Sequence, residues 1–434
     1  MGTSARGILM KTICKAQNFG LNTTTCGTLK VLNNYSDIQN FKKNNIALFN
    51  KNFFLSDSLI IISNLLEKGA KGFISFNSTK SDHGCIAAKE MGMNFYSISS
   101  KSNKILSYEG KNVTLKNEKI FEGTEKKLIK NKNKNKNLKK IYTKHKVKIN
   151  LGFPDLIISN KKVIDFCDGV GFSRIEFLLS QILQNIHPKK YLEMHGLKKF
   201  SLKIADSLRP AVKAFYKKNK EYWIRTDDLS VEQLINMEFG KVYEIKERNI
   251  SSGLRGIRRS IRDKEFIIPQ FKAIKILLNE GFDNIAIFPP MTNSIKEYKR
   301  WLKIAEDCGI KKIKKGLMVE TPRAALMIEE FLKHINFVVF GTNDLTSFLL
   351  SVDRNNSRIQ NIFNETDEVV MKVIKETIIK CKNKFVETYI GGQIADNEKF
   401  IKELTAVGLT GVSVNPDLQT IYKIRKFYSN LEKK

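Results

Sequence analysis

The second part of the chain repeats one pattern, a short apolar run followed by a stretch with helical spacing. Buried strands that alternate with helices form a parallel sheet covered by those helices. Repeated over about 290 residues, the pattern predicts an α/β fold with a (β/α)8 TIM barrel, and a doubly wound open sheet is the alternative. The apolar runs are KVKINL (146–151), EYWIRT (221–226), NIAIFPP (284–290), KKGLMVE (314–320), NFVVFGTND (336–344), VETYIGG (386–392) and GVSVNP (411–416).

A smaller mixed α/β domain is predicted before the barrel. Short β-like runs lie at 46–49, 71–76, 94–99 and 112–115, and helical stretches lie at 57–68 and 83–91. The segment TEKKLIKNKNKNKNLKKIYTKHK carries like charges and almost no apolar periodicity, so it is expected to be extended and solvated. We therefore predict a small domain at 1–123, a mobile Lys/Asn-rich linker at 124–146 and the barrel at 147–434.

The chain is strongly basic, with 75 Lys and Arg against 44 Asp and Glu and a net charge of +31. Such a charge by itself favours polyanionic partners, including nucleic acid. The excess is mostly Lys and is spread along the chain, without a patch of interleaved aromatic and Arg residues. We therefore predict no nucleic-acid partner.

The cysteines and the apolar runs exclude other classes of protein. Six cysteines lie far apart without a CxxC pair, which argues against a zinc site or a disulfide framework. The longest apolar runs fall far short of the roughly 18 residues that span a bilayer, and the N-terminus lacks the apolar core of a signal peptide. A cytoplasmic location without membrane association is expected.

Two acidic residues follow separate predicted strands of the barrel. Glu320 ends KKGLMVE and Asp344 follows VVFGTN, so both are expected at the mouth where the loops after the strands gather. Two carboxylates with open positions suit Mg²⁺, which keeps several waters and completes its octahedron with phosphate or carboxylate oxygens. A helix-capping role is the alternative for either residue taken alone.

Four arginines stand at strand ends or beside glycines in a chain whose basic residues are mainly Lys: Arg174, Arg225, Arg255 and Arg354. Guanidinium groups bind phosphate and carboxylate bidentately and stay charged. The set predicts a small substrate that bears both groups, although each arginine could instead form a surface or structural ion pair.

One histidine, His83 in SDHGCIAAKEMG, begins a predicted helix. A histidine there can carry a phosphoryl group, because the helix dipole and the free backbone N–H groups stabilise negative charge. Taken alone, His83 is better explained as a polar residue at a helix start.

Together these motifs resemble those of the phosphoenolpyruvate-utilising enzymes, which comprise phosphoenolpyruvate (PEP) synthase, pyruvate phosphate dikinase and enzyme I of the sugar phosphotransferase system. The match runs from about residue 20 nearly to the end of the chain, and the synthase is the most similar member. The stretches that carry the resemblance are SDHGCIAAKEMGM (similar to TSHAAIVARELGI), DGVGFSRIEFLL (EGVGLARLEFLI), YWIRTDD (VRTLD), GLRGIRR (GWRGIR), GTNDLTSFLLSVDRNN (GTNDLTQYTLAVDRGN), GVSVNPD (ISLNPD) and KINLGFPD (MNVGNPD).

The resemblance implies a swivelling β/β/α phosphohistidine domain, a mobile linker and a barrel that binds pyruvate or PEP. It also implies that His83 is the phosphorylated residue and that Glu320 and Asp344 bind Mg²⁺. It also implies a homodimer formed through the barrel. The residues implied to bind substrate are Arg174, Arg225, Arg255, Glu320, Gly341, Thr342, Asn343, Asp344 and Arg354.

The chain departs from the family pattern in three places. The family's ICGQ loop reads IGGQ here, so Gly391 stands where a cysteine exchanges a proton with the enolate carbon. Ser78 and Thr79 replace a diglycine before the histidine motif, and Asp82 stands beside His83. No ATP-grasp domain precedes the small domain, so a separate ATP-grasp chain is the expected partner if ATP is used.

Three functions remain open at this level. The leading hypothesis is the C-terminal part of a PEP synthase-like phosphotransferase, which transfers a phosphoryl group between a phosphohistidine and pyruvate. An enzyme I-like donor to a carrier protein is the first alternative. The second is a catalytically impaired descendant that binds ligand or regulates a partner, which the glycine at position 391 favours.

Overall fold

The computed structural model describes residues 10–20, 23–51, 58–78, 83–90, 93–124, 138–158, 160–354, 356 and 358–433. The chain divides into two compact units, residues 1–134 and 135–434. The division falls inside the predicted linker 124–146, of which residues 125–137 lie outside the described part. Each unit is described by itself.

The first unit contains an eight-stranded mixed sheet with the order β1-β8-β7-β3-β4-β5-β6-β2, in which β3 to β6 are parallel and the remaining pairs are antiparallel. The predicted runs at 46–49, 71–76, 94–99 and 112–115 are β4 to β7. The strands are β1 (Thr12–Lys15), β2 (Gln17–Asn18), β3 (Thr25–Leu32), β4 (Asn45–Phe49), β5 (Gly72–Phe76), β6 (Asn94–Ile98), β7 (Asn112–Lys116) and β8 (Lys119–Glu122). The α-helices are α1 (Tyr35–Gln39), α2 (Ser58–Glu67) and α3 (His83–Glu90).

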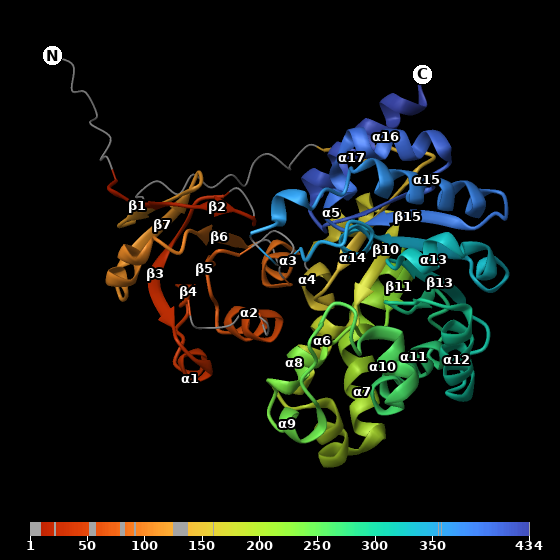
Figure 1. The fold of residues 1–434 in the computed structure, drawn as a ribbon, viewed down its shortest axis with the longest axis horizontal. Helices are drawn as coiled ribbons and strands as arrows, with labels where there is room; N and C mark the ends of the chain where they lie inside the picture. Colours follow the sequence, from red (N-terminus) through yellow and green to blue (C-terminus); the bar gives the residue numbers. More distant parts are fainter. Residues whose placement is uncertain are drawn as a thin grey trace. The chain divides into compact units, whose positions relative to one another are not determined.

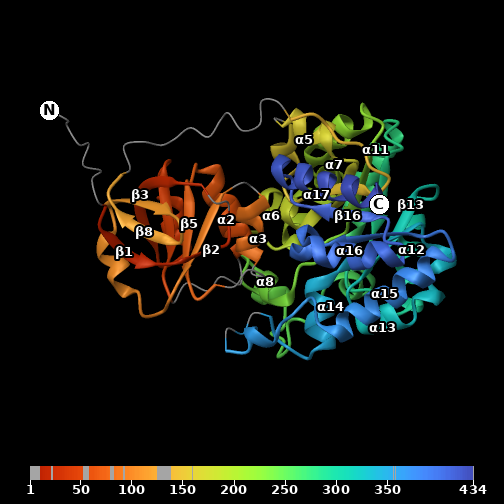
Figure 2. The same ribbon diagram turned by 90° about the horizontal axis from the view of Figure 1, so that it is seen from above.

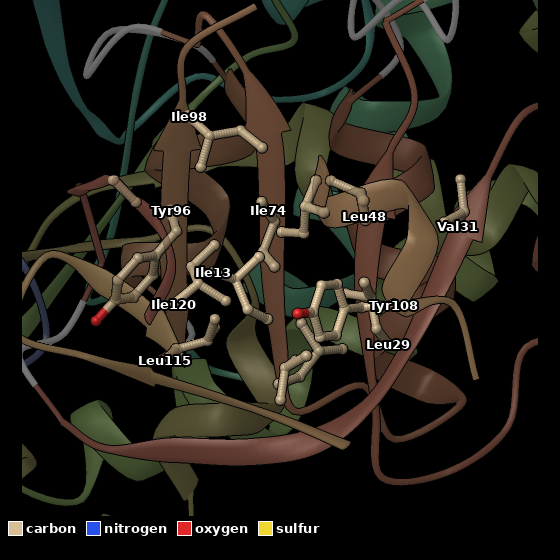
Figure 3. Close-up of a cluster of buried hydrophobic side chains, with 14 residues drawn as sticks. Ile13, Leu29, Val31, Leu48, Ile74, Tyr96, Ile98, Tyr108, Leu115 and Ile120 are labelled. Atoms are coloured by element: carbon tan, nitrogen blue, oxygen red, sulfur yellow. The ribbon is translucent and has the colours of Figure 1, made fainter. Parts of the chain in front are cut away.

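Apolar side chains from seven of these strands form the core of the first unit (Figure 3). The alternation of a strand directs every second side chain to the same face. Leu29 and Val31 of β3 accordingly face the cluster together, as do Tyr96 and Ile98 of β6. Tyr108, from the 3₁₀ helix Asn103–Tyr108, packs into the same cluster.

The second unit is a closed barrel of eight parallel strands in sequence order, with β16 paired to β9, which confirms the predicted TIM barrel. Helices lie outside the strands (Figures 1 and 2). The strands are β9 (Lys146–Leu151), β10 (Gly169–Arg174), β11 (Glu221–Arg225), β12 (Ile285–Phe288), β13 (Lys314–Val319), β14 (Phe337–Gly341), β15 (Glu387–Gly391) and β16 (Gly411–Val414). The α-helices are α4 (Pro154–Ile158), α5 (Lys161–Phe166), α6 (Ile175–Leu183), α7 (Pro188–Tyr216), α8 (Val231–Ile235), α9 (Gly240–Tyr243), α10 (Gly256–Arg262), α11 (Lys264–Asn279), α12 (Ile295–Asp307), α13 (Pro322–Leu326), α14 (Thr342–Leu349), α15 (Glu368–Lys382), α16 (Glu398–Val407) and α17 (Leu418–Glu432).

Seven of the eight barrel strands coincide with the predicted apolar runs, and β10 is the one that the pattern does not mark. Its sequence, GVGFSR, is interrupted by glycine and serine. The barrel interior requires this, because a Cβ atom on Gly171 would lie 2.2 Å from the Oγ of Ser413. This contact between Gly171 and Ser413 requires a glycine within the strand, so β10 has no continuous apolar run that would mark it in the sequence.

Side chains fill the barrel interior, so it is a packed core and not a channel. Trp223 stacks on Phe337 with ring centroids 3.7 Å apart. The buried ammonium of Lys148 lies 3.5 Å from the centroid of Trp223 and 2.6 Å from Glu221 Oε2. Burial lowers the pKa of Lys148, and the Glu221 carboxylate opposes this shift. No helix in the described ranges is long and apolar enough to cross a membrane.

Removing the charge of Glu221 is expected to destabilise the barrel. Glu221→Gln leaves Lys148 buried with a weaker partner, and we expect a loss of about 2–3 kcal/mol in the free energy of unfolding, measured by urea denaturation. Lys148→Met is expected to cost less, because Glu221 is partly exposed and keeps Lys314 and Trp223 Nε1 as partners. Equal losses for the two variants would contradict this account.

Candidate active site

The predicted charged residues of the barrel meet at the C-terminal ends of its strands. Arg225 ends β11, Glu320 follows β13, and Asp344 lies in the first turn of α14, which follows β14. Arg255 directly precedes α10, and Arg354 follows α14. Strand ends of a parallel barrel share one rim, which brings side chains from distant parts of the sequence together.

Asp228 links two of the predicted arginines. Its two carboxylate oxygens accept from one edge of the Arg255 guanidinium, Oδ1 from Nε at 2.9 Å and Oδ2 from Nη2 at 2.6 Å. Arg225 Nη1 lies 3.6 Å from the same carboxylate. All three side chains are buried. Such a fork-shaped pair fixes the plane of the guanidinium as well as its position.

The ion pairs continue at both ends of this group. Arg225 Nη2 donates to Glu176, a buried residue in the first turn of α6. Arg255 Nη1 lies 3.5 Å from Asp344 Oδ1, and Arg354 Nη1 lies 3.4 Å from Asp344 Oδ2. Six alternating charges therefore form one chain of ion pairs across the barrel mouth, in the order Glu176, Arg225, Asp228, Arg255, Asp344 and Arg354.

Glu320 is fully buried beside this chain of ion pairs. Its Oε1 accepts from the backbone N–H of Met291, and no group of the described residues lies within hydrogen-bonding distance of Oε2. Burial, together with the negative charges of Asp344 and Asp228, raises the pKa of Glu320 to about 8. A buried carboxylate oxygen without a partner costs free energy unless a further group binds it.

The backbone is shaped around Glu320. A Cβ atom on Gly341 would lie 2.7 Å from Glu320 Oε2, so a larger residue there would displace the carboxylate. Met291 has a φ of 57°, in the left-handed region that a bulky side chain rarely adopts. In this conformation its N–H points at Glu320 Oε1. Such a strained residue beside a buried charge is typical of a functional site.

Glu320 and Asp344 are the two predicted residues that could hold a divalent cation. Mutual repulsion with Asp344 contributes to the raised pKa of Glu320, and the unpartnered Oε2 is an available ligand atom. The described residues include no group of three His, Cys, Asp or Glu side chains arranged to hold a metal. Two carboxylates with water or substrate oxygens in the other positions would be the ligand set of an ion such as Mg²⁺.

Three further predicted residues surround this centre. The half-buried Arg174 lies with its guanidinium carbon 4.6 Å from the ring centroid of Phe172, and its charge acts on Glu176. Thr342 is buried at the start of α14, where its Oγ1 donates to Glu365 Oε1 at 2.5 Å. Asn343 follows it and is half-buried.

The residues around the predicted phosphohistidine belong to the first unit. His83 is the first residue of α3, and its side chain lies outside the described part. Thr79 and Asp82 also lie outside it. Ser78 is buried, and its carbonyl oxygen accepts from Ser97 Oγ at 2.9 Å.

Gly391 ends β15, and its neighbours fill the space that a side chain would need. A Cβ atom there would lie 2.8 Å from Cε1 of Phe172 and 3.2 Å from Cγ1 of Val339. The phenylalanine at position 172, where the family motif has leucine, therefore occupies the volume in front of Gly391. The large side chain at position 172 thus fills the space that the absence of a side chain at position 391 leaves.

The sequence analysis missed Glu176, Asp228 and Glu365. The first two stand inside the motifs SRIEF and RTDD, each within three residues of a predicted arginine. Acidic residues are scarce in this basic chain, so an acid at such a position was an available signal. Glu365 lies in a polar segment 23 residues after Thr342, where nothing in the local pattern marks it.

Comparison with known proteins gives one family and a set of curated relatives. Residues 125–432 match the family described as PEP-utilising enzyme, PEP-binding domain. A probable phosphoenolpyruvate synthase of Archaeoglobus fulgidus is 34% identical over 375 residues, which cover 85% of this chain and 48% of the relative. The phosphoenolpyruvate synthase of Pyrococcus furiosus is 31% identical over 381 residues, 85% of this chain and 45% of the relative. The chain thus spans about half the length of these relatives.

A side chain at position 391 is expected to destabilise the barrel. Gly391→Ala places a methyl group against the Phe172 ring, and we expect a loss of about 1–3 kcal/mol in the free energy of unfolding. Phe172→Leu opens that space, so the double variant should be more stable than the sum of the two single changes implies. A double-mutant cycle by urea denaturation measures the coupling, and strictly additive losses would show that the two positions do not share the space.

Proposed function

Because this chain belongs to the PEP-utilising enzymes, we propose that it is a PEP synthase-like phosphotransferase that moves a phosphoryl group between His83 and pyruvate or PEP. The observation that carries the proposal is the chain of ion pairs at the barrel mouth, with the unpartnered carboxylate oxygen of Glu320 beside it. The names of the curated relatives support the same reaction class.

Charge balance at the mouth suits an anionic substrate that arrives with a cation. When Glu320 is ionised, as cation binding requires, its carboxylate and those of Glu176, Asp228 and Asp344 balance the charges of the four arginines Arg174, Arg225, Arg255 and Arg354. PEP carries both a carboxylate and a phosphate, so its charge needs additional compensation. When bound by Glu320 and Asp344, Mg²⁺ would supply positive charge next to the substrate oxygens.

The protein's own part in the reaction is positioning and charge neutralisation, which is most of what phosphoryl transfer requires. Carboxylate partners hold the guanidinium groups of Arg225 and Arg255 in fixed planes before substrate arrives. We propose that these arginines, with Arg174 and Arg354, bind the carboxylate and phosphate, while Gly341, Thr342 and Asn343 line the substrate. The start of α3 would stabilise the phosphoryl group on His83.

One observation favours a second function, that of a binding or regulatory protein with impaired catalysis. The Phe172 ring and Val339 leave no room for a side chain at position 391, so no thiol can stand at that point. The retained chain of ion pairs weighs against this reading, because buried charges are costly and nothing in the barrel fold itself requires them. A homodimer and a separate ATP-grasp chain stay predictions.

Phosphoryl uptake tests the proposed reaction. The full chain incubated with Mg²⁺ and PEP labelled in the phosphate is expected to take up label, and His83→Ala is expected to take up none. His195→Ala, which removes a histidine of α7, serves as the matched control and should be labelled like wild type. Equal labelling of His83→Ala and wild type, or no labelling of either, would refute the phosphocarrier role.

Cation binding tests the assignment of Glu320. Its raised pKa of about 8 means that the carboxyl is largely protonated at neutral pH, and a cation binds the ionised form. We therefore expect Mg²⁺ binding to release a proton and the affinity for Mg²⁺ to rise as the pH increases to about 8. Glu320→Gln should abolish the proton release and weaken binding at least tenfold. Calorimetry in two buffers of different ionisation enthalpy measures both, and pH-independent binding would contradict the assignment.

A further inference from the structure

The hydrogen-bonded pair Thr342 and Glu365 adjoins the barrel mouth without belonging to its chain of ion pairs. Thr342 begins α14 directly after β14, and Glu365 lies in the segment that leads to α15. Their oxygens, Oγ1 and Oε1, are 2.5 Å apart, at the short end for such bonds. The threonine donates when the acid is ionised, and the acid donates when it is protonated, so a proton can pass in either direction.

The Thr342 hydroxyl lies beside the two glycines at the end of β15. It lies 3.4 Å from the carbonyl oxygen of Gly391. Among the described residues, a Cβ atom on Gly392 would meet this hydroxyl alone within 4 Å, at 2.9 Å. The residue before Thr342 is Gly341, and the absence of a side chain at Gly341 leaves room for the Glu320 carboxylate. The hydroxyl therefore lies between the carboxylate centre and the side-chain-free end of β15.

The environment of Glu365 favours its protonated form. Burial and the negative charge of Asp396 raise the pKa of Glu365, while the hydrogen bond from Thr342 and the charge of Arg354 oppose the shift. Among the acids of the mouth, Glu176, Asp228 and Asp344 are paired with arginines. Glu320 is the proposed cation ligand. Glu365 is hydrogen-bonded to the Thr342 hydroxyl, so it can hold and release a proton at that oxygen.

The proposed reaction needs such a group. When the P–O bond of PEP breaks, its electron pair stays on the enolate oxygen, and C3 of the enolate must gain a proton to give pyruvate. The reverse direction removes a proton from the methyl carbon of pyruvate. Gly391 and Gly392, at the end of β15, have no side chain that could take part.

We propose that Thr342 and Glu365 transfer this proton. The Thr342 O–H bond breaks as the C3–H bond forms, and the Glu365 carboxyl proton passes to Thr342 Oγ1, which leaves a carboxylate. In the reverse direction the ionised Glu365 withdraws the proton through the same hydroxyl. Thr342 contacts the reacting carbon, and Glu365 acts through it. This inference rests on the proposed function, since it requires pyruvate at the barrel mouth.

Exchange of the methyl protons of pyruvate in D₂O measures the step without phosphoryl transfer. With Mg²⁺ and the full chain, NMR should show deuterium entering the methyl group. General acid–base catalysis contributes about 10²–10⁴-fold, so Glu365→Gln and Thr342→Val are each expected to slow exchange at least about 100-fold. Thr342→Ser keeps the hydroxyl and should retain most of the rate. With Mg²⁺ saturating at each pH, the wild-type rate should rise with pH as Glu365 ionises, and Glu365→Gln should lose that dependence.

Matched controls separate proton transfer from damage to the fold. Thr346→Val removes a buried hydroxyl one turn further along α14, and Glu368→Gln removes an exposed carboxylate at the start of α15. Both should exchange like wild type, and thermal melting should show every variant folded. Calorimetric binding of pyruvate and PEP tests the proposed function independently.

Each result decides the question. Wild-type exchange rates in folded Glu365→Gln or Thr342→Val would overturn the inference and leave the proposed function standing. A wild-type chain that binds pyruvate without exchanging its protons would do the same. A wild-type chain that binds neither pyruvate nor PEP would overturn both.

Discussion

The chain of alternating charges at the barrel mouth is the interaction on which the rest of the site depends. It joins the segments after β10, β11 and β14, which are far apart in the sequence. Each charge has lost most of its hydration, and only its neighbours compensate that cost. Arg255 is an example, because its guanidinium forms ion pairs with both Asp228 and Asp344. Truncating one link would leave its partners buried with uncompensated charge, so the mouth holds together as a unit.

Glu320 is compensated only in part, because Arg225 and Arg255 act on its charge without forming an ion pair with it. Its carboxylate has one backbone N–H and no guanidinium within hydrogen-bonding distance among the described residues, and two like charges act on it. Gly341 and the strained backbone of Met291 hold it in place at a cost in conformational freedom. Paired charges beside a carboxylate with an unpartnered oxygen support the proposal that the site binds an anion accompanied by a cation.

The two glycine-rich strand ends show how packing and chemistry share the same space. At Gly341 the missing side chain makes room for a carboxylate, whereas at Gly391 the room is taken by the Phe172 ring. The glycine at 391 and the phenylalanine at 172 therefore form one structural feature, in which the ring fills the space that a side chain at 391 would need. Its consequence is that proton transfer, if it takes place, must use groups from neighbouring elements, and the hydroxyl of Thr342 is such a group.

The sequence by itself determined the barrel and most of its charged residues. Periodicity is local, so seven strands could be predicted, and an acid or arginine directly after a strand had to face the mouth. Tertiary structure alone decided the rest. The contact with Ser413 requires a glycine at position 171, which is why β10 lacks a continuous apolar run. The fold also brings Glu176, Asp228 and Glu365 to partners that lie between 3 and 49 positions away in the sequence. Ion pairing, burial and pKa depend on distances through space, which a local pattern does not encode, so the roles of these acids emerge only when the strands close into a barrel.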